Sequence, residues 1–254
     1  MEIIFLGTGS STGTPVIGCT CPTCTSTDPR NKRTRCSVAI KIDSGATLLI
    51  DTGPDLRLQA LREEIVRVDG VLYTHTHADH LNGIDDLRNF CFLQKQVIPV
   101  YGNDITINSI RQRFSYAFAP PGQHWDKPVL SSWVVSEPFD FEGARVTPIP
   151  VMHGKLPILG YRINNAAYVT DVSEIPESSL SLLSGLDTLL LDCLHYHPHP
   201  THIHFDKSLE YAAKINARQT YLIHMTHQME YADVTRKLPP ATYLAYDGLR
   251  LRLD

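Results

Sequence analysis

The sequence predicts an α/β fold in which two β-sheets pack face to face and helices cover both of them, a four-layer αββα sandwich. Short apolar runs bounded by Gly, Asp or His recur along the chain, and they outnumber the segments with helical periodicity. The helical segments lie between these runs, as in α/β proteins. No internal repeat and no Pro-, Gly- or Ser-rich linker divides the chain, so we expect one domain over residues 1–254.

Two sequence patterns define the individual elements: continuous apolar runs indicate strands, and apolar residues every three to four positions indicate helices. The expected strands are the apolar runs at residues 3–6, 38–42, 47–50, 70–73, 98–101, 145–149, 159–163, 167–170, 188–191, 220–223 and 249–253. The expected helices, in which apolar residues recur every three to four positions, are at 56–64, 104–118, 177–183 and 206–216. With 43% hydrophobic residues in a chain of 254, these elements can bury a sizeable core.

Residues 118–138 fit neither pattern. This segment contains Pro120-Pro121-Gly122, an isolated His124, Trp125 and two further prolines, so we expect a long irregular excursion. Excursions of this length are often lids or binding loops, although surface decoration without a function is an alternative.

Charge and composition exclude several classes of partner. The formal net charge is -4, from 23 basic and 27 acidic residues, and the chain has no basic run of the kind that binds nucleic acid. Met1 leads directly into a strand-like run, and no stretch approaches the ~20 apolar residues of a membrane span. We therefore expect a cytoplasmic protein that binds neither a nucleic-acid polymer nor a membrane. We also expect a homodimer, although charge and composition do not indicate one. In that compartment the six cysteines are better explained as metal ligands or buried thiols than as disulfides.

A cluster of metal-binding residue types follows the run at 70–73. His75, His77, Asp79 and His80 place three imidazoles and one carboxylate within six consecutive positions. Neutral nitrogen ligands combined with an anionic oxygen suit zinc, or manganese where carboxylates have more weight. The alternative is an exposed loop that happens to be rich in histidine. The tight spacing and the preceding strand favour a metal site with hydrolytic chemistry.

Three later residues could complete this site. His153, Asp171 and His224 each follow an apolar run, and strand ends are where ligands are commonly presented. Each of them alone could be a polar residue that merely ends a strand. Together with the first cluster they make seven ligands, the number needed for two ions about 3.5–4 Å apart that share a carboxylate.

The order of these residues resembles the signature of the metallo-β-lactamase superfamily. The resemblance implies the αββα fold and metal-dependent hydrolysis. It also implies how the ligands divide: His75, His77 and His153 would hold one ion, Asp79, His80 and His224 would hold the other, and Asp171 would bridge the two. A carboxylate at Asp79 suits phosphodiester or thioester hydrolysis better than β-lactam hydrolysis, and we count Asp79 among the catalytic residues.

Two further carboxylates are candidates for orienting the ligand imidazoles. Asp51, in Leu49-Ile50-Asp51-Thr52-Gly53, resembles an early Asp of the superfamily that holds a ligand histidine from behind. Asp51 could instead only end a strand and cap the helix that follows. Asp192 ends the run at 188–191, and it is either a similar partner for a ligand histidine or a simple strand terminus.

A second type of metal site is predicted at residues 18–24. Cys19, Cys21 and Cys24 have C-x-C-x-x-C spacing on a loop rich in Gly, Pro and Thr, and His227 could supply a fourth ligand. A Cys3His set is tetrahedral and closed, which is typical of a structural zinc ion. The alternative is three reduced surface thiols beside an unrelated histidine.

The cysteine loop narrows the resemblance. Phe5-Leu6-Gly7-Thr8-Gly9-Ser10, the three cysteines and His224-x-x-His227 are together similar to the PhnP-type phosphodiesterases, which hydrolyse phosphoribosyl 1,2-cyclic phosphate. The resemblance implies two active-site divalent ions, manganese or zinc, one structural zinc, and a small phosphate ester such as that compound or a cyclic nucleotide as substrate. Alternatives are a transfer-RNA 3'-end endonuclease, a PqqB-like protein, or a protein that binds a metal or ligand without catalysis.

Residues 195–204 contain five histidines, more than one metal pair could use. By resemblance, Pro200-Thr201-His202 matches the family histidine beside the two ions, so His202 is the expected general acid. His204 takes that role if the register differs by two residues. Lys155, Arg88 and Arg57 are either phosphate contacts or ordinary surface charges.

Overall fold

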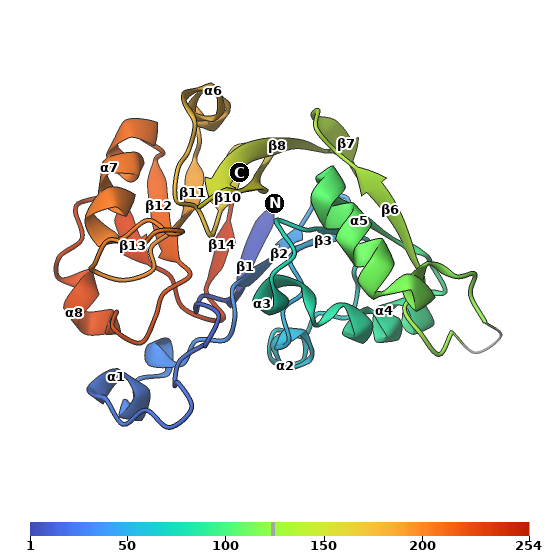
Figure 1. The fold of residues 1–254 in the computed structure, drawn as a ribbon, viewed down its shortest axis with the longest axis horizontal. Helices are drawn as coiled ribbons and strands as arrows, with labels where there is room; N and C mark the ends of the chain where they lie inside the picture. Colours follow the sequence, from blue (N-terminus) through green and yellow to red (C-terminus); the bar gives the residue numbers. More distant parts are fainter. Residues whose placement is uncertain (123–124, 254) are drawn as a thin grey trace.

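A computed structural model describes residues 1–122 and 125–253. Two sheets of seven strands each pack against one another, and helices cover the outer face of each sheet (Figure 1). The predicted four-layer αββα sandwich is therefore confirmed.

The first sheet has the strand order β14-β1-β2-β3-β4-β5-β6. Its strands are β1 (Glu2–Gly7), β2 (Ser37–Lys41), β3 (Thr47–Ile50), β4 (Gly70–Leu72), β5 (Ile98–Gly102), β6 (Leu130–Val134) and β14 (Arg250–Arg252). The strands from β3 to β6 run parallel. Parallel neighbours need crossover connections, and these contain the helices α2 (Leu56–Arg62), α3 (Ala78–Leu81), α4 (Leu87–Gln94) and α5 (Asp104–Arg113).

The second sheet has the order β13-β12-β11-β10-β9-β8-β7. Its strands are β7 (Phe139–Phe141), β8 (Ala144–His153), β9 (Leu156–Ile163), β10 (Ala166–Val169), β11 (Thr188–Asp192), β12 (Gln219–Ile223) and β13 (Thr242–Leu244). The strands from β10 to β13 run parallel. Their crossovers contain α6 (Glu177–Leu180), α7 (Phe205–Ile215) and α8 (Tyr231–Thr235), and α1 (Pro22–Thr25) lies in the cysteine loop.

The central strands are buried on both faces, which explains their continuous apolar runs. In β1, Ile3 and Phe5 join the cluster between the two sheets, whereas Ile4 and Leu6 join the cluster beneath the helices of the first sheet. This alternation follows from the two-residue period of a strand. A third cluster packs the second sheet against α6 and α7.

Each expected strand is found, but several elements were missed. The missed strands β6, β7 and β13 lie at or next to sheet edges, where short, partly polar segments give little periodic signal. The missed helices include α3, α4 and α8. The expected helix at 104–118 ends at Arg113, and a short 3-10 helix follows over Ser115–Phe118.

The prediction of an irregular excursion over residues 118–138 is partly wrong, because Leu130–Val134 forms β6 and pairs parallel with β5. Val129 contacts α4 through hydrogen bonds with Cys91. Figure 1 places the described residues just before β6 at the outer edge of the first sheet, beyond α4. His124 lies outside the described residues. A lid function of this segment, and a single domain over 1–254, stay predictions.

No helix within the described ranges is both long enough and apolar enough to span a membrane.

Candidate metal centres

The candidate site lies where the carboxyl ends of parallel strands from both sheets meet. Asp51 follows β3, His75 lies just after β4, Asp171 follows β10 and His224 follows β12. Asp51, Asp171 and His224 have positive φ angles of 63°, 55° and 60°. This conformation costs roughly 1–2 kcal/mol for a residue with a side chain. Such strain persists where the surroundings hold it in place, and it is concentrated at functional sites.

Seven side chains form two groups that share one carboxylate. In each group the potential ligand atoms all lie within 4.8 Å of one another. One group contains His75, His77, His153 and Asp171, and the other contains Asp79, His80, His224 and Asp171. The structure therefore brings together all seven residues selected from the sequence, and it divides them in the way that the resemblance implied.

The two oxygens of Asp171 face different groups. Oδ1 lies 4.0 Å from Nε2 of His75. Oδ2 lies 3.1 Å from Nε2 of His80 and 3.2 Å from Nε2 of His224. Asp171 is only 2% exposed, so both oxygens are directed into the site. This is the geometry expected of a carboxylate that bridges two ions.

The second ring nitrogen of four of the histidines has a partner outside the two groups. Nδ1 of His80 lies 2.7 Å from Asp51, and Nδ1 of His153 lies 2.8 Å from a backbone carbonyl, that of Thr201. Nδ1 of His75 contacts the Thr74 hydroxyl, which donates to Asp51, and Nδ1 of His224 lies 3.3 Å from Asp192. The hydrogen bonds of His75, His80 and His153 place the imidazole proton on Nδ1 and leave Nε2 free to bind a metal, whereas Nδ1 of His224 faces Asp192 without a hydrogen bond. Asp51 therefore supports ligands, and Asp55, not Asp51, occupies the N-cap position of α2.

The free Nε2 atoms provide a test of whether ions fit. Those of His75, His80 and His224 are buried and have no hydrogen-bond partner. An unsatisfied buried polar atom costs about 1–3 kcal/mol, and one divalent ion in each group would satisfy all three atoms. The two groups thus fit a dinuclear metal site.

The electrostatics of the site also fit cations. Burial lowers the pKa of His75 well below its ordinary value, which leaves the ring neutral with a free lone pair. Burial has the same effect on His224, but the carboxylates of Asp171, Asp192 and Asp79 outweigh it and raise the pKa of His224 to about 10. In the absence of ions, protonated imidazoles therefore balance the buried carboxylates.

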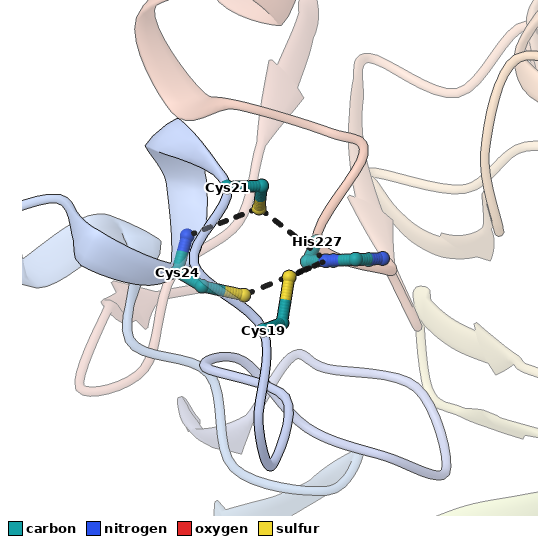
Figure 2. Close-up of side chains that lie close together, drawn as sticks. All are labelled: Cys19, Cys21, Cys24 and His227. Carbon is teal, nitrogen blue, oxygen red and sulfur yellow. Dashed lines mark hydrogen bonds between the residues drawn. The ribbon is translucent and has the colours of Figure 1, made fainter.

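The four residues of the predicted structural zinc site also come together (Figure 2). Nδ1 of His227 lies 3.3 Å from the sulfur of Cys19, 3.4 Å from that of Cys21 and 3.5 Å from that of Cys24. In a tetrahedral zinc site with ordinary bond lengths, sulfur and nitrogen ligands are about 3.6 Å apart. The Cys24 backbone N–H donates to Cys21 and helps to lower the pKa of that thiol to about 6. This Cys3His group could hold a structural metal ion.

The two metal sites are connected by residues 224–227, which carry both His224 and His227. The motif around Gly9 holds this loop, since Met225 donates to the Thr8 carbonyl and accepts from the Ser10 N–H, both at 3.0 Å. The glycine-rich segment that precedes the cysteine loop therefore fixes, through backbone hydrogen bonds, the loop that carries residues of both metal sites.

His202 lies at the site and His204 does not. His202 is stacked on His224 with ring centroids 5.0 Å apart, and its Nε2 lies 3.9 Å from Oδ1 of Asp171. Its Nδ1 lies 3.4 Å from Asp192, whose other oxygen faces His224. His204 instead occupies the N-cap position of α7.

The basic residues selected from the sequence lie in different environments. Arg88 pairs with Asp85, and Arg57 lines an apolar groove between α2 and α4. Lys155 is exposed on the turn after His153. Arg113 also lies beside the site, although no sequence pattern indicates it. Its guanidinium donates to the carbonyl of Thr76, which lies between two of the clustered histidines. In the sequence nothing distinguishes Arg113 from its neighbour Arg111.

Comparison with known proteins agrees with this geometry. Residues 46–225 match the Beta-lactamase superfamily domain. The crystal structure of a diphosphatase from the PhnP family is 42% identical, with a TM-score of 0.92, and the match covers 98% of this chain and 96% of that one. The chain belongs to the PhnP family of the metallo-β-lactamase superfamily.

Curated relatives of this chain have different names. An octanoyltransferase of Porphyromonas gingivalis is 38% identical over 264 residues, covering 100% of this chain but 52% of the relative. The chain thus spans about half the length of that protein. Coenzyme PQQ synthesis protein B of Methylobacterium radiotolerans is 25% identical, and the match covers 76% of this chain and 72% of that protein.

We expect metal binding to release protons. A proton on His224, whose pKa is raised to about 10, must leave before Nε2 can bind an ion. Affinity should therefore rise as the pH rises toward that value and fall as the pH is lowered. Titration calorimetry at pH 7 in buffers of different ionisation enthalpy should show about one to two protons released per pair of ions. Binding without any proton release would contradict this assignment.

The number of bound ions should be three per chain, because each of the two groups that share Asp171 would hold one ion and the Cys3His group would hold the third. Cys24→Ser should reduce this number to two, since a neutral hydroxyl is a poor zinc ligand. Elemental analysis of the purified protein measures both values. Two ions in the unaltered chain, with no change in the variant, would exclude the Cys3His site.

A close backbone contact should make Gly53 important for metal binding by the group that contains Asp79. A Cβ at Gly53 would lie 2.2 Å from the carbonyl oxygen of Asp79, so alanine there must displace α3. We expect Gly53→Ala to weaken metal binding about 10- to 100-fold, as changes behind metal ligands generally do. Gly122→Ala is the control, because its Cβ meets only the Asp126 side chain at 3.5 Å. Equal affinities of the two variants, measured by competition with a chelator, would refute the role of this contact.

Proposed function

We propose that this chain is a dinuclear metal-dependent hydrolase of a small phosphoric diester, such as phosphoribosyl 1,2-cyclic phosphate or a cyclic nucleotide. The observation that carries the proposal is the position of Asp171, which presents one oxygen to each histidine group, with His202 beside it. Membership of the PhnP family supports chemistry at phosphorus, since the related crystal structure is that of a diphosphatase. The net charge of -4 and the absence of a basic run support a small substrate rather than a nucleic-acid polymer.

The two active-site ions, manganese or zinc, would polarise a phosphoryl oxygen and lower the pKa of a water molecule toward neutrality. The residues of the chain then have to hold and move protons. Nδ1 of His202 lies 3.4 Å from Asp192, so this carboxylate orients the ring from behind. Nε2 of His202 faces Asp171 and can deliver its proton to the leaving oxygen. Such proton transfer is typically worth about 100- to 10,000-fold in rate.

Asp79 can take part in the same reaction. Burial tends to raise the pKa of Asp79, but His224 and His80 outweigh this effect and keep the carboxyl ionised. Its Oδ2 lies 3.3 Å from Nε2 of His80. The side chain is 13% exposed, more than that of Asp171, so an attacking water can reach it. Asp79 would then both bind an ion and orient the nucleophile through a hydrogen bond.

A diphosphate substrate is the second candidate, and the 42% identity to a diphosphatase favours it. The same residues would serve both reactions. The leaving groups differ, because a departing phosphate is far less basic than a departing alkoxide and needs less help from an acid. Hydrolysis of a diphosphate should accordingly depend less on His202 than hydrolysis of a cyclic diester does.

The substrate class can be tested with a panel on the manganese- or zinc-loaded chain. The panel contains phosphoribosyl 1,2-cyclic phosphate, cyclic nucleotides, bis(p-nitrophenyl) phosphate, nucleoside diphosphates and precursor transfer RNA. An octanoyl thioester is included because one relative is named an octanoyltransferase. We expect turnover of the small cyclic diesters and none of the transfer RNA. No turnover of any phosphate ester by fully loaded protein would exclude the proposed function.

His202→Ala should keep both active-site ions and lose about 100- to 10,000-fold in kcat on a cyclic diester. Asp171→Ala should lose the ion pair itself, because Asp171 belongs to both groups. His197→Ala is the matched control on the same loop, since His197 is exposed and lies in neither group. Steady-state kinetics combined with elemental analysis distinguish these outcomes. Full activity of metal-replete His202→Ala would refute the role of His202.

A further inference from the structure

Arg113 is fixed against the loop that carries the first four candidate ligands. It lies in the last turn of α5. Nη1 donates to the Thr76 carbonyl at 2.8 Å, and Nη2 donates to the Asn82 side-chain oxygen at 2.6 Å. Thr76 lies between His75 and His77, and Asn82 caps the helix that contains Asp79 and His80. The guanidinium therefore has a defined position beside the metal centre.

Both acceptors are neutral, so the charge of Arg113 is not balanced. The carboxylate of Asp85, on the same side of the molecule, is bound by Arg88 and by the Tyr116 hydroxyl. Within residues 1–122 and 125–253, no carboxylate forms an ion pair with Arg113. Of the five N–H groups of a guanidinium, three remain available, and the side chain is exposed.

The site is open to solvent at this point. His77 and Ala78 are exposed, whereas His75 and His80 are buried. A substrate that reaches the ions past His77 would therefore pass next to Arg113. An oriented guanidinium with free donors is well suited to bind a phosphate through paired hydrogen bonds.

We propose that Arg113 is a specificity residue that binds a second anionic group of the substrate, a phosphate that is not itself hydrolysed. This inference rests on the proposed function in one respect, namely that the substrate is a phosphoric ester. It narrows the substrate class to small phosphodiesters or diphosphates that carry an additional phosphate. A cyclic diester that carries such an additional phosphate should be preferred over the same diester without it, which keeps only the single charge of the diester.

Binding of matched ligands tests the proposal without requiring turnover. Calorimetry on the metal-loaded chain compares ribose 1,5-bisphosphate with ribose 1-phosphate, which lacks the distal phosphate. We expect the bisphosphate to bind about 10- to 100-fold more tightly, the range for a hydrogen-bonded charge. Arg113→Gln should abolish this preference and Arg113→Lys should restore part of it. Arg111→Gln, which removes the same charge from the same helix, is the control and should retain the full preference.

A purely structural role of Arg113 would give a different result. If Arg113 only holds the loop, Arg113→Gln should weaken both ligands equally and lower the metal content. Equal loss for the two ligands, or equal affinity of the unaltered chain for both, overturns the proposal. Kinetics with phosphoribosyl 1,2-cyclic phosphate and its 5-dephospho analogue then separate the two claims. Hydrolysis of both without an Arg113-dependent difference in KM refutes this inference alone, whereas hydrolysis of neither refutes the proposed function.

Discussion

The architecture of the site depends on the buried carboxylate of Asp171, which connects the two histidine groups. Its backbone is held at a positive φ of 55° at the end of β10, and its two oxygens are directed toward different histidine groups. A buried anion of this kind is costly unless cations or protons balance it. Neighbouring imidazoles, chiefly those of His224 and His80, lower the pKa of Asp171 well below its ordinary value despite its burial. Two divalent ions can take over that role.

The two sheets support the centre in equivalent ways. The first sheet contributes Asp51, which contacts His80 directly and His75 through the Thr74 hydroxyl. The second sheet contributes Asp192, which faces both His224 and His202. Each sheet thus places one buried carboxylate behind a pair of histidines, and Asp171 lies between the pairs. Because Asp192 serves both a candidate ligand and the candidate acid, the position of the proton donor is coupled to the position of the ion.

Much of this arrangement was predictable from local sequence. The strands that are buried on both faces have continuous apolar runs, and the ligands follow those runs at strand ends. The division of the ligands followed from the resemblance. Local patterns did not predict contacts between distant segments: His202 was expected ahead of His204 by resemblance alone, and the position of Arg113 depends on how α5 packs beside α3. Short edge strands such as β13 have too few residues for a periodic signal.

The most direct test of the central claim is anomalous X-ray diffraction from crystals of the chain loaded with zinc or manganese. The account predicts two anomalous peaks about 3.5–4 Å apart, one at each oxygen of Asp171. A third peak should lie among Cys19, Cys21, Cys24 and His227. A single peak between the two histidine groups, or two peaks that are both beyond ligand distance of Asp171, would contradict the account.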